Sequence, residues 1–261
     1  MMTTAAGVRT VAVCPEGGSD QVIEETAIAL VYNGVSHVVM MATPADLEDF
    51  ALGFSLSERI LDDAAQLYGL EIVSHPRGIE IRMEVAASAF SGLKNRRRNL
   101  VGRTGCGLCG AESLEQALPE PRPVATDFSC SASALEHAVG ALAGRQPLKQ
   151  LTGSVHAAAY CDSSGHILAL REDVGRHNAL DKLIGSLCRG GGQAAGFVLV
   201  TSRASYEMVA KTAAAGIPML AAVSAPTSLA IEQAQVSGVT LVGHLITDRH
   251  VIYSVPERIV V

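Results

Sequence analysis

Two cysteines separated by two residues are the pair in this sequence best suited to chemistry. They stand in Gly105-Cys106-Gly107-Leu108-Cys109-Gly110. Three glycines in six residues disfavour a helix or a strand, because glycine loses the most backbone entropy when it is ordered. Residues 94–103, just before the pair, include five basic residues and no acidic one. Because nearby positive charge favours the thiolate, the sequence predicts a mobile, cationic loop with two reactive thiols.

Three functions are compatible with such a loop. The first is half of a structural zinc site, but zinc takes four ligands, typically from two such pairs. The remaining cysteines stand singly, so a complete site would need a second chain. The second is a dithiol redox motif, which usually lies where a strand meets a helix; the glycines fit that poorly. The third is a carrier of sulfur as a persulfide, which needs an exposed thiolate. The loop chemistry favours the carrier and leaves the others open.

Composition sets the class of protein. The chain has 261 residues, of which 48% are hydrophobic and 18% charged, so it can bury a large core. Its formal net charge of −6 argues against sequence-independent binding of nucleic acid, which relies on Lys and Arg. The basic run at 94–98 is interpreted as a solvated turn. We find no secretory signal, no stretch that could cross a membrane and no disulfide framework, and we expect a cytoplasmic protein with reduced thiols.

The first part of the chain is expected to form a small α+β domain over residues 1–118. Asn33-Gly34 predicts a hairpin, because both central residues of a type I′ turn need positive φ. Thr43-Pro44-Ala45-Asp46 predicts a helix start with Thr43 as the cap. A second hairpin is expected around His75-Pro76-Arg77-Gly78. The predicted strands are 26–32, 35–40, 70–74 and 79–85.

The second part, residues 119–261, is expected to form a three-layer α/β/α domain, so that the whole chain is of the α/β class (α+β overall). The boundary is placed at Pro119, Pro121 and Pro123. Ser133 and Glu136 predict a capping box that opens a helix ending at Gly144. Strands that alternate with helices favour a mainly parallel sheet covered on both faces. The predicted strands are 155–161, 166–171, 197–201, 219–223, 239–242 and 251–255; the predicted helices are 176–188, 204–215 and 226–236.

Three polar strand-to-helix turns are candidates for a ligand site. Such turns gather at the carboxyl ends of strands, where helix N-termini favour an anion. Arg176 and Arg203 add forked donors suited to phosphate. The turns are Glu172-Asp173-Val174-Gly175-Arg176-His177, Thr201-Ser202-Arg203-Ala204-Ser205 and Ser224-Ala225-Pro226-Thr227-Ser228.

Structural roles could explain the same residues. Ser202 and Ser205 could have no role other than capping a helix, and Asp173 could form a local ion pair with Arg176. Glu207 and Lys211 are spaced for a simple i, i+4 bridge. A lone histidine in a polar cluster is often structural, and His177 is a better functional candidate than His156.

The sequence resembles the formate dehydrogenase accessory sulfurtransferases, the FdhD family, along nearly its whole length. The motifs that carry the resemblance occur in the same order as in the family. They are Asn33-Gly34, Met41-Ala42-Thr43-Pro44, Asp46-Leu47-Glu48, Leu52-Gly53-Phe54, Gly105-Cys106-Gly107-Leu108-Cys109-Gly110, Arg171-Glu172-Asp173-Val174-Gly175-Arg176-His177-Asn178-Ala179-Leu180-Asp181-Lys182, Ser205-Tyr206-Glu207-Met208-Val209-Ala210-Lys211 and Ser224-Ala225-Pro226-Thr227-Ser228-Leu229-Ala230.

The resemblance implies a sulfur carrier. Such proteins take sulfur from a cysteine desulfurase as a persulfide, here on Cys106 with Cys109 as its partner. They pass it to the molybdenum or tungsten bis-guanine-dinucleotide cofactor, bound as a substrate, before that cofactor enters formate dehydrogenase. A homodimer without a tightly held metal of its own is also implied. The cofactor-binding residues expected from the resemblance and from the turns are His244, Leu245, Ile246, Thr247, Asp248, Arg249, Arg176, His177, Ser202 and Arg203.

Two motifs depart from the family. The family often has Ser-Gly-Arg where this chain has Thr201-Ser202-Arg203. It often has Gly-Phe and then an arginine where this chain has Gly243-His244-Leu245-Ile246. The second departure lies in the segment expected to bind the cofactor.

Two other functions are weighed against the carrier. The order of elements in the second half also looks like a cytidine-deaminase scaffold. A zinc deaminase needs a glutamate after its helix histidine and a Pro-Cys-x-x-Cys motif. His177-Asn178-Ala179 lacks the first, and Ser202-Arg203-Ala204-Ser205 lacks the second. A non-catalytic chaperone that escorts the cofactor stays open, because it would use the same surface.

Overall fold

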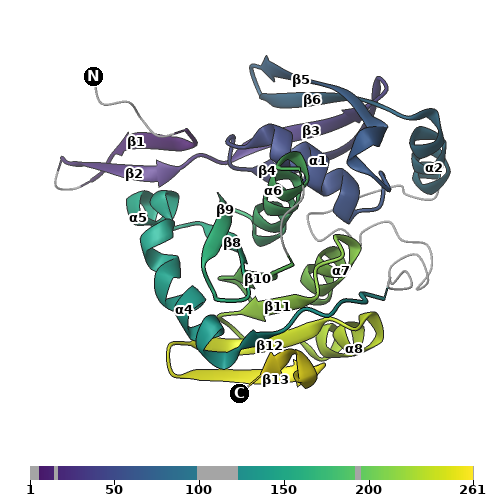
Figure 1. The fold of residues 1–261 in the computed structure, drawn as a ribbon. Helices are drawn as coiled ribbons and strands as arrows, with labels where there is room; N and C mark the ends of the chain where they lie inside the picture. Colours follow the sequence, from purple (N-terminus) through teal and green to yellow (C-terminus); the bar gives the residue numbers. More distant parts are fainter. Residues whose placement is uncertain (1–5, 15–16, 99–122, 192–194, 261) are drawn as a thin grey trace.

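The protein is a mixed α/β structure with two main sheets. The computed structural model describes residues 6–14, 17–98, 123–191 and 195–260, with 94–98 described by their backbone alone. A four-stranded sheet comes from the first hundred residues and a six-stranded sheet from the second half of the chain. Figure 1 shows the helices α1 (Leu47–Ser57) and α6 (Arg176–Arg189) side by side between these sheets.

The four-stranded sheet has the strand order β4-β3-β6-β5. Its two hairpins are those predicted, and Asn33 and Gly34 have φ values of 46° and 78°, as a type I′ turn requires. Helix α1 covers one face, where Ile28, Phe50 and Phe54 form part of a buried core. The elements are β3 (Thr26–Tyr32), β4 (Val35–Ala42), α1 (Leu47–Ser57), β5 (Leu67–His75) and β6 (Gly78–Val85).

The start of α1 differs from the prediction. Asp46, which has a φ of 53°, occupies the N-cap position without a side-chain capping bond, so Thr43 is not the cap. The backbone N–H of Thr43 donates to the carboxylate of Asp173 at 2.9 Å, and its hydroxyl accepts from the N–H of Val174 at 3.1 Å. Thr43 is therefore held by the second half of the chain, which sequence spacing could not predict.

A two-stranded ribbon and a helix in the first half were not predicted. Strands β1 (Val8–Ala12) and β2 (Ser19–Ile23) form an antiparallel ribbon. Helix α2 (Ala87–Arg98) includes the basic run at 94–98, so the interpretation of that run as a turn is wrong.

The six-stranded sheet has the order β13-β12-β11-β10-β8-β9 and is mixed, so the prediction of a mainly parallel sheet is wrong. Only β10, β11 and β12 pair in parallel. The connections β8–β9 and β12–β13 span five and two residues, which allows hairpins but not parallel crossovers. The strands are β8 (His156–Cys161), β9 (Ile167–Asp173), β10 (Phe197–Val200), β11 (Met219–Ala222), β12 (Thr240–Ile246) and β13 (Arg249–Ser254).

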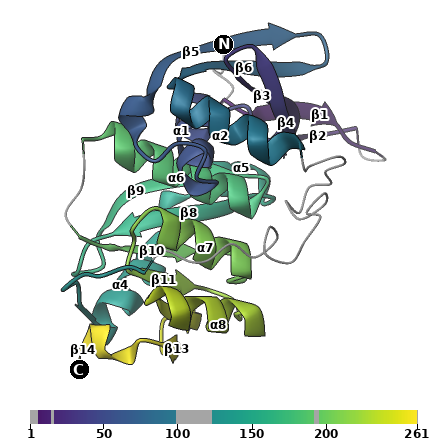
Figure 2. The ribbon, with the colours of Figure 1, turned by 90° about the vertical axis from the view of Figure 1, so that its right-hand side faces the viewer.

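Helices cover both faces of this sheet, as the three-layer prediction requires. Leu135 of α4 packs with Ala159 and Leu199 on one face. Leu180 of α6 and Met208 of α7 belong to the core on the opposite face. Figure 2 shows α6, α7 and α8 on that side of the sheet. The helices are α4 (Ala132–Leu142), α5 (Pro147–Thr152), α6 (Arg176–Arg189), α7 (Tyr206–Ala214) and α8 (Ser228–Ser237). Three 3-10 turns, η1 (Ala64–Gln66), η2 (Ala143–Arg145) and η3 (Pro256–Arg258), and the short strands β7 (Cys130–Ser131) and β14 (Ile259–Val260) complete the structure.

The cap of α4 also corrects a prediction. Ser131 is the N-cap, and its hydroxyl accepts from the N–H of Ala134 at 3.2 Å. The predicted capping box at Ser133 and Glu136 is therefore wrong by two residues, because Ser133 already lies inside the helix.

The two halves meet where α1 crosses α6. A Cβ atom added to Gly53 would lie 1.7 Å from the carbonyl oxygen of Asp181, and one added to Gly185 would lie 1.9 Å from that of Asp49. Glycine at both positions therefore allows the two backbones to touch. The predicted boundary between residues 118 and 119 falls outside the described residues and stays a prediction.

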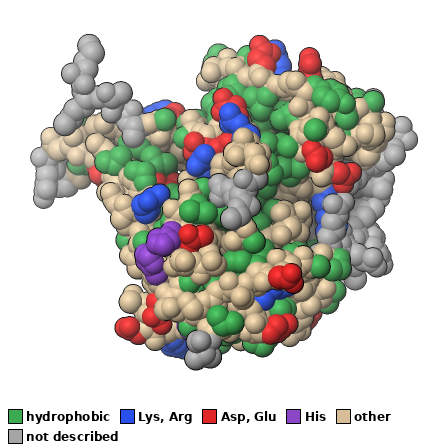
Figure 3. Space-filling model, viewed as in Figure 1, with side chains coloured by type: hydrophobic (Ala, Val, Ile, Leu, Met, Phe, Trp, Pro, Cys, Tyr) green, Lys and Arg blue, Asp and Glu red, His purple; other side chains and the backbone are tan. Residues whose placement is uncertain are grey.

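Two observations bear on the classes of partner. In the described part of the chain, no helix has both the length and the apolar character needed to cross a bilayer. On the face drawn in Figure 3, acidic and basic side chains are interspersed among apolar and neutral ones. That face lacks, among its described side chains, the basic stripe typical of nucleic-acid binding.

Candidate functional site

The polar turns of the second half lie along one edge of the six-stranded sheet. Strands β9, β10, β11 and β12 run in the same direction, because β9 and β10 are both antiparallel to β8. The N–H of Thr227 donates to the carbonyl of Ala204 at 3.1 Å, and that of His244 to the carbonyl of Ser224 at 3.1 Å. The structure thus brings the turns after β9, β10 and β11 to the edge where β12 also ends.

The turn between β9 and α6 is organised by Asp173. This buried carboxylate accepts from the N–H of Gly175 at 2.7 Å and pairs with Lys182 at 2.7 Å. The alternative of a local ion pair between Asp173 and Arg176 is therefore wrong. Helix α6 has Gly175 as its N-cap and receives no side-chain cap, so its first N–H groups face the edge with Arg176 and His177 beside them.

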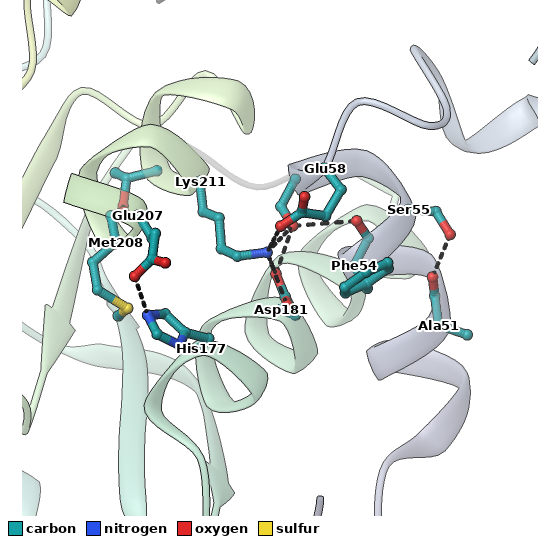
Figure 4. A network of polar contacts seen from close by, with 11 residues as sticks. Ala51, Phe54, Ser55, Glu58, His177, Asp181, Glu207, Met208 and Lys211 are labelled. Carbon is teal, nitrogen blue, oxygen red and sulfur yellow. Dashed lines mark hydrogen bonds and ion pairs between the residues drawn. The ribbon is translucent and has the colours of Figure 1, made fainter. Parts of the chain in front are cut away.

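Histidines and basic side chains converge at this helix start. Nε2 of His177 lies 3.0 Å from a carboxylate oxygen of Glu207 (Figure 4). Burial raises the pKa of the Glu207 carboxyl, but His177 and nearby cations lower it by a larger amount. The pKa therefore lies below its usual value. The pKa of His156 is lowered, first by burial and then by its neighbours Arg176, Lys149 and His177. The edge therefore combines positive charge with a free helix N-terminus.

The turn between β10 and α7 adds Ser202 and Arg203. The hydroxyl of Ser202 donates to the carbonyl of Arg203 at 3.0 Å, so Ser202 does not cap a helix. Ser205 occupies the N-cap position of α7, but its side chain makes no capping bond. Its buried hydroxyl oxygen has no hydrogen-bond partner among the described residues. Arg203 is exposed at the same turn.

The residues from His244 to Arg249 differ in their exposure to solvent. His244 has a φ of 51° where the register between β12 and β13 is irregular. Such backbone strain often marks functional sites. The N–H of His244 is hydrogen-bonded to Ser224 in the β11–α8 turn at the edge. Leu245 is fully buried in the core on the α4 side, whereas Ile246 and the next three residues are exposed. The segment therefore contains one core residue among the predicted binding residues.

The cysteine pair lies outside the described residues. Cys106 and Cys109 therefore stay predictions, as does the zinc alternative. Of the described cysteines, Cys130 and Cys161 are buried, which raises the pKa of their thiols to about 11 and about 12. Cys188 also has a raised pKa, caused by burial and then by Asp63. Within the described ranges, no group of three or more His, Cys, Asp or Glu side chains is placed to hold a metal.

Sequence reasoning missed a buried network between three helices. Glu207 and Lys211 do not bridge each other: Glu207 pairs with His177, and Lys211 pairs with Asp181 and Glu58 (Figure 4). One signal was present, since Asp181 stands among residues of α6 that pack in the core. A charge on an apolar helix face predicts a buried partner.

A second missed feature is the support of α5 by Glu172. The buried carboxylate of Glu172 accepts from the N–H groups of Leu148 and Lys149 at 2.8 and 2.9 Å. It therefore fixes the start of α5, the short helix that carries Lys149 to the cationic cluster around His156.

The site and fold define an α/β protein with a cation-lined edge on a mixed sheet and an α+β unit packed against it. A crystal structure of a candidate formate dehydrogenase accessory protein from Desulfotalea psychrophila is similar, with a TM-score of 0.75 and 27% identity over 97% of this chain and 98% of that one. Residues 23–260 match the FdhD/NarQ family, and the chain belongs to that family.

Curated relatives support the same family. A protein from Cupriavidus necator named "Sulfur carrier protein FdhD" is 56% identical over 92% of this chain and 84% of its own length. One of the same name from Bordetella petrii is 52% identical over 92% of this chain and 87% of its own length. The expected family is thereby confirmed.

Proposed function

We propose that the protein is a sulfur carrier that serves the maturation of formate dehydrogenase. The observation that carries this proposal is the family match over residues 23–260, together with relatives more than half identical that are named sulfur carriers. The proposed activity is that of a sulfurtransferase with a cysteine persulfide intermediate.

Cys106 is the proposed sulfur acceptor. Its thiolate attacks the outer sulfur of a persulfide on a cysteine desulfurase. A new sulfur–sulfur bond forms on Cys106, the bond in the donor breaks, and the donor cysteine leaves as a thiolate, so no external oxidant is needed. Cys109 is its partner. The buried thiols of Cys130 and Cys161 are poor substitutes, because their raised pKa keeps them protonated near neutral pH.

The proposed recipient of sulfur is a molybdenum or tungsten bis-guanine-dinucleotide cofactor, held as a substrate. Its phosphates would lie against the N-terminus of α6, where Arg176 supplies positive charge and the rings of His177 and His156 lie nearby. Arg203 and Ser202 line the next turn, and His244 the end of β12. These residues bind and orient the anion; the pattern of donors supports this placement.

The partners follow from this function. A cysteine desulfurase supplies sulfur and formate dehydrogenase receives the sulfurated cofactor. We further propose a homodimer that works in the cytoplasm, where thiols stay reduced.

Activation of formate dehydrogenase tests the carrier directly. The enzyme is produced in a host whose own carrier is deleted, with this protein or Cys106→Ala supplied in its place. We expect activity with the unaltered protein and a loss with Cys106→Ala, although that variant still binds GDP. Full activity with Cys106→Ala would instead favour a protein that only escorts the cofactor.

Calorimetric titration with GDP tests the anion site. We expect Arg176→Gln to weaken binding by about tenfold, the value of one charge-assisted contact. Arg9→Gln is the matched control, because Arg9 is an exposed arginine in the N-terminal ribbon. Equal affinities for all three proteins would place the guanine nucleotide elsewhere.

A further inference from the structure

Lys211 is the centre of a buried network that joins three helices. Its ammonium group lies 2.7 Å from Glu58 at the end of α1 and 3.0 Å from Asp181 of α6. It also donates to the hydroxyl of Ser57 at 2.9 Å, and that hydroxyl donates to Asp181 at 2.6 Å. Asp181 and Lys211 are almost completely buried, with side chains 1% and 7% exposed.

Stability alone is a weak reason for such a network. Removing two charges from water costs as much as their attraction returns, so a buried ion pair adds little net stability over apolar residues of the same size. Burial lowers the pKa of Lys211, but Asp181 and Glu58 raise it by more, so the group stays an ammonium. Burial raises the pKa of the Asp181 carboxyl, and Lys211 and Ser57 oppose that shift. The Lys211 ammonium therefore stays bound between Asp181, Ser57 and Glu58 and constrains where the helices lie.

The positions of the charged residues form two parallel rungs between α6 and α7. Asp181 and Lys211 make the inner rung. One helical turn earlier on each helix, His177 and Glu207 make the outer rung at the start of α6 (Figure 4). Because residues four apart lie on one helix face, the inner rung sets the spacing at which the outer rung can form.

We infer that Lys211 is a positioning residue for the anion site, because it fixes α7 against α1 and α6. In this way it holds Glu207 on His177 and places the β10–α7 turn, with Arg203, beside the start of α6. The inference rests on the proposed function, in which this edge binds the guanine dinucleotide. It also gives the N-terminal half a part in that site, because Ser57 and Glu58 belong to α1 and its end.

The double variant Lys211→Met/Asp181→Asn separates positioning from stability. It removes both buried charges together, and it leaves no buried charge without its partner. We expect a melting temperature close to that of the unaltered protein and unchanged loading of sulfur by a desulfurase, measured by intact mass. We expect GDP to bind about tenfold more weakly, because small misplacements of binding groups have large effects.

Asp49→Asn is the matched control. Asp49 of α1 pairs with Arg171 at 2.7 Å and with Arg189 of α6 at 2.9 Å, so it joins the same two halves without touching α7. We expect its GDP affinity to stay within about twofold of the unaltered protein. An equal loss in both variants would assign the effect to loosening of the two halves and overturn the inference.

Two other outcomes are decisive. Unweakened GDP binding by the double variant would overturn the role of Lys211 while leaving the proposed site intact. Absence of GDP binding by the unaltered protein would overturn the site and this inference with it, whereas sulfur loading reports on the carrier separately. If the double variant does not fold, Lys211→Met/Asp181→Leu gives the same test, because it also removes both charges and puts apolar side chains of similar size in their place.

Discussion

Lys182 and Asp173 form an ion pair of 2.7 Å in which neither side chain is exposed to solvent. Both residues also bind the backbone of Thr43: Lys182 donates to its carbonyl at 2.9 Å, and Asp173 accepts from its N–H at 2.9 Å. The family signature at 171–182 therefore serves in large part to hold the N-terminal half. Arg176 and His177 are the signature residues that are left to face the edge of the sheet.

We expect Lys182→Met to destabilise the protein by about 3–5 kcal/mol, because it leaves Asp173 buried without its counter-ion. The free energy of unfolding in urea measures this. Arg9→Ala serves as the control, since the Arg9–Glu24 pair is exposed and such pairs contribute at most about 1 kcal/mol. Similar small losses in both variants would show that the buried pair does not hold the halves together.

A second prediction concerns the contact between α1 and α6. We expect Gly53→Ala to cost about 3 kcal/mol or more, because the added methyl group would overlap the backbone of Asp181. Gly140→Ala on α4 is the control: a Cβ there meets open space, and alanine should stabilise the helix by up to about 1 kcal/mol. Thermal unfolding of the Gly53→Ala and Gly140→Ala variants measures both effects. A tolerated Gly53→Ala would contradict the close approach of the helices.

The sequence predicted features that depend on local chemistry. The Asn33-Gly34 turn needs only two residues that accept positive φ, and both hairpins of the first half form as expected. The helices α6, α7 and α8 begin within two residues of their predicted starts. The apolar faces of these helices and the turns beside them are determined by residues close together in the sequence. Predicting them therefore requires no knowledge of the rest of the fold.

Features set by tertiary contacts could not be read in this way. Thr43 has the side chain and position of a helix cap, but Asp173, far along the chain, binds its backbone. The Gly-containing turn between the predicted strands 155–161 and 166–171 indicates the hairpin of β8 and β9, which the structure confirms. The strands predicted at 239–242 and 251–255 are too far apart in the sequence to reveal the hairpin of β12 and β13. At the candidate site, the sequence predicted that the turns with Arg176 and His177 lie together, but not that Lys211 pairs with Asp181. That pairing depends on how α6 and α7 pack.

A third prediction uses the buried thiol of Cys161. Burial raises its pKa from 9.0 to about 12, so above pH 9 the unfolded chain ionises while the folded protein does not. The contribution to stability is complete below pH 9 and is lost as the pH rises toward 12. In urea unfolding from pH 8 to 11, we expect stability to decline less steeply in Cys161→Ala, by up to about 1.4 kcal/mol per pH unit.

Cys14→Ala controls for the other groups that titrate in this range, because Cys14 is exposed. Its decline with pH should match that of the unaltered protein. If Cys161→Ala also declines as steeply as the unaltered protein, the thiol is not protected by burial.

Sulfur loading on the cysteine pair is the most direct test of the proposed carrier. The reduced protein is incubated with a cysteine desulfurase and cysteine, and its intact mass is compared with those of Cys106→Ala and Cys109→Ala. We predict a gain of about one sulfur atom that disappears in Cys106→Ala, because transfer requires a nucleophilic thiolate at that position. No gain with an active desulfurase, or a gain that both variants retain, would contradict the assignment of Cys106 as the sulfur carrier.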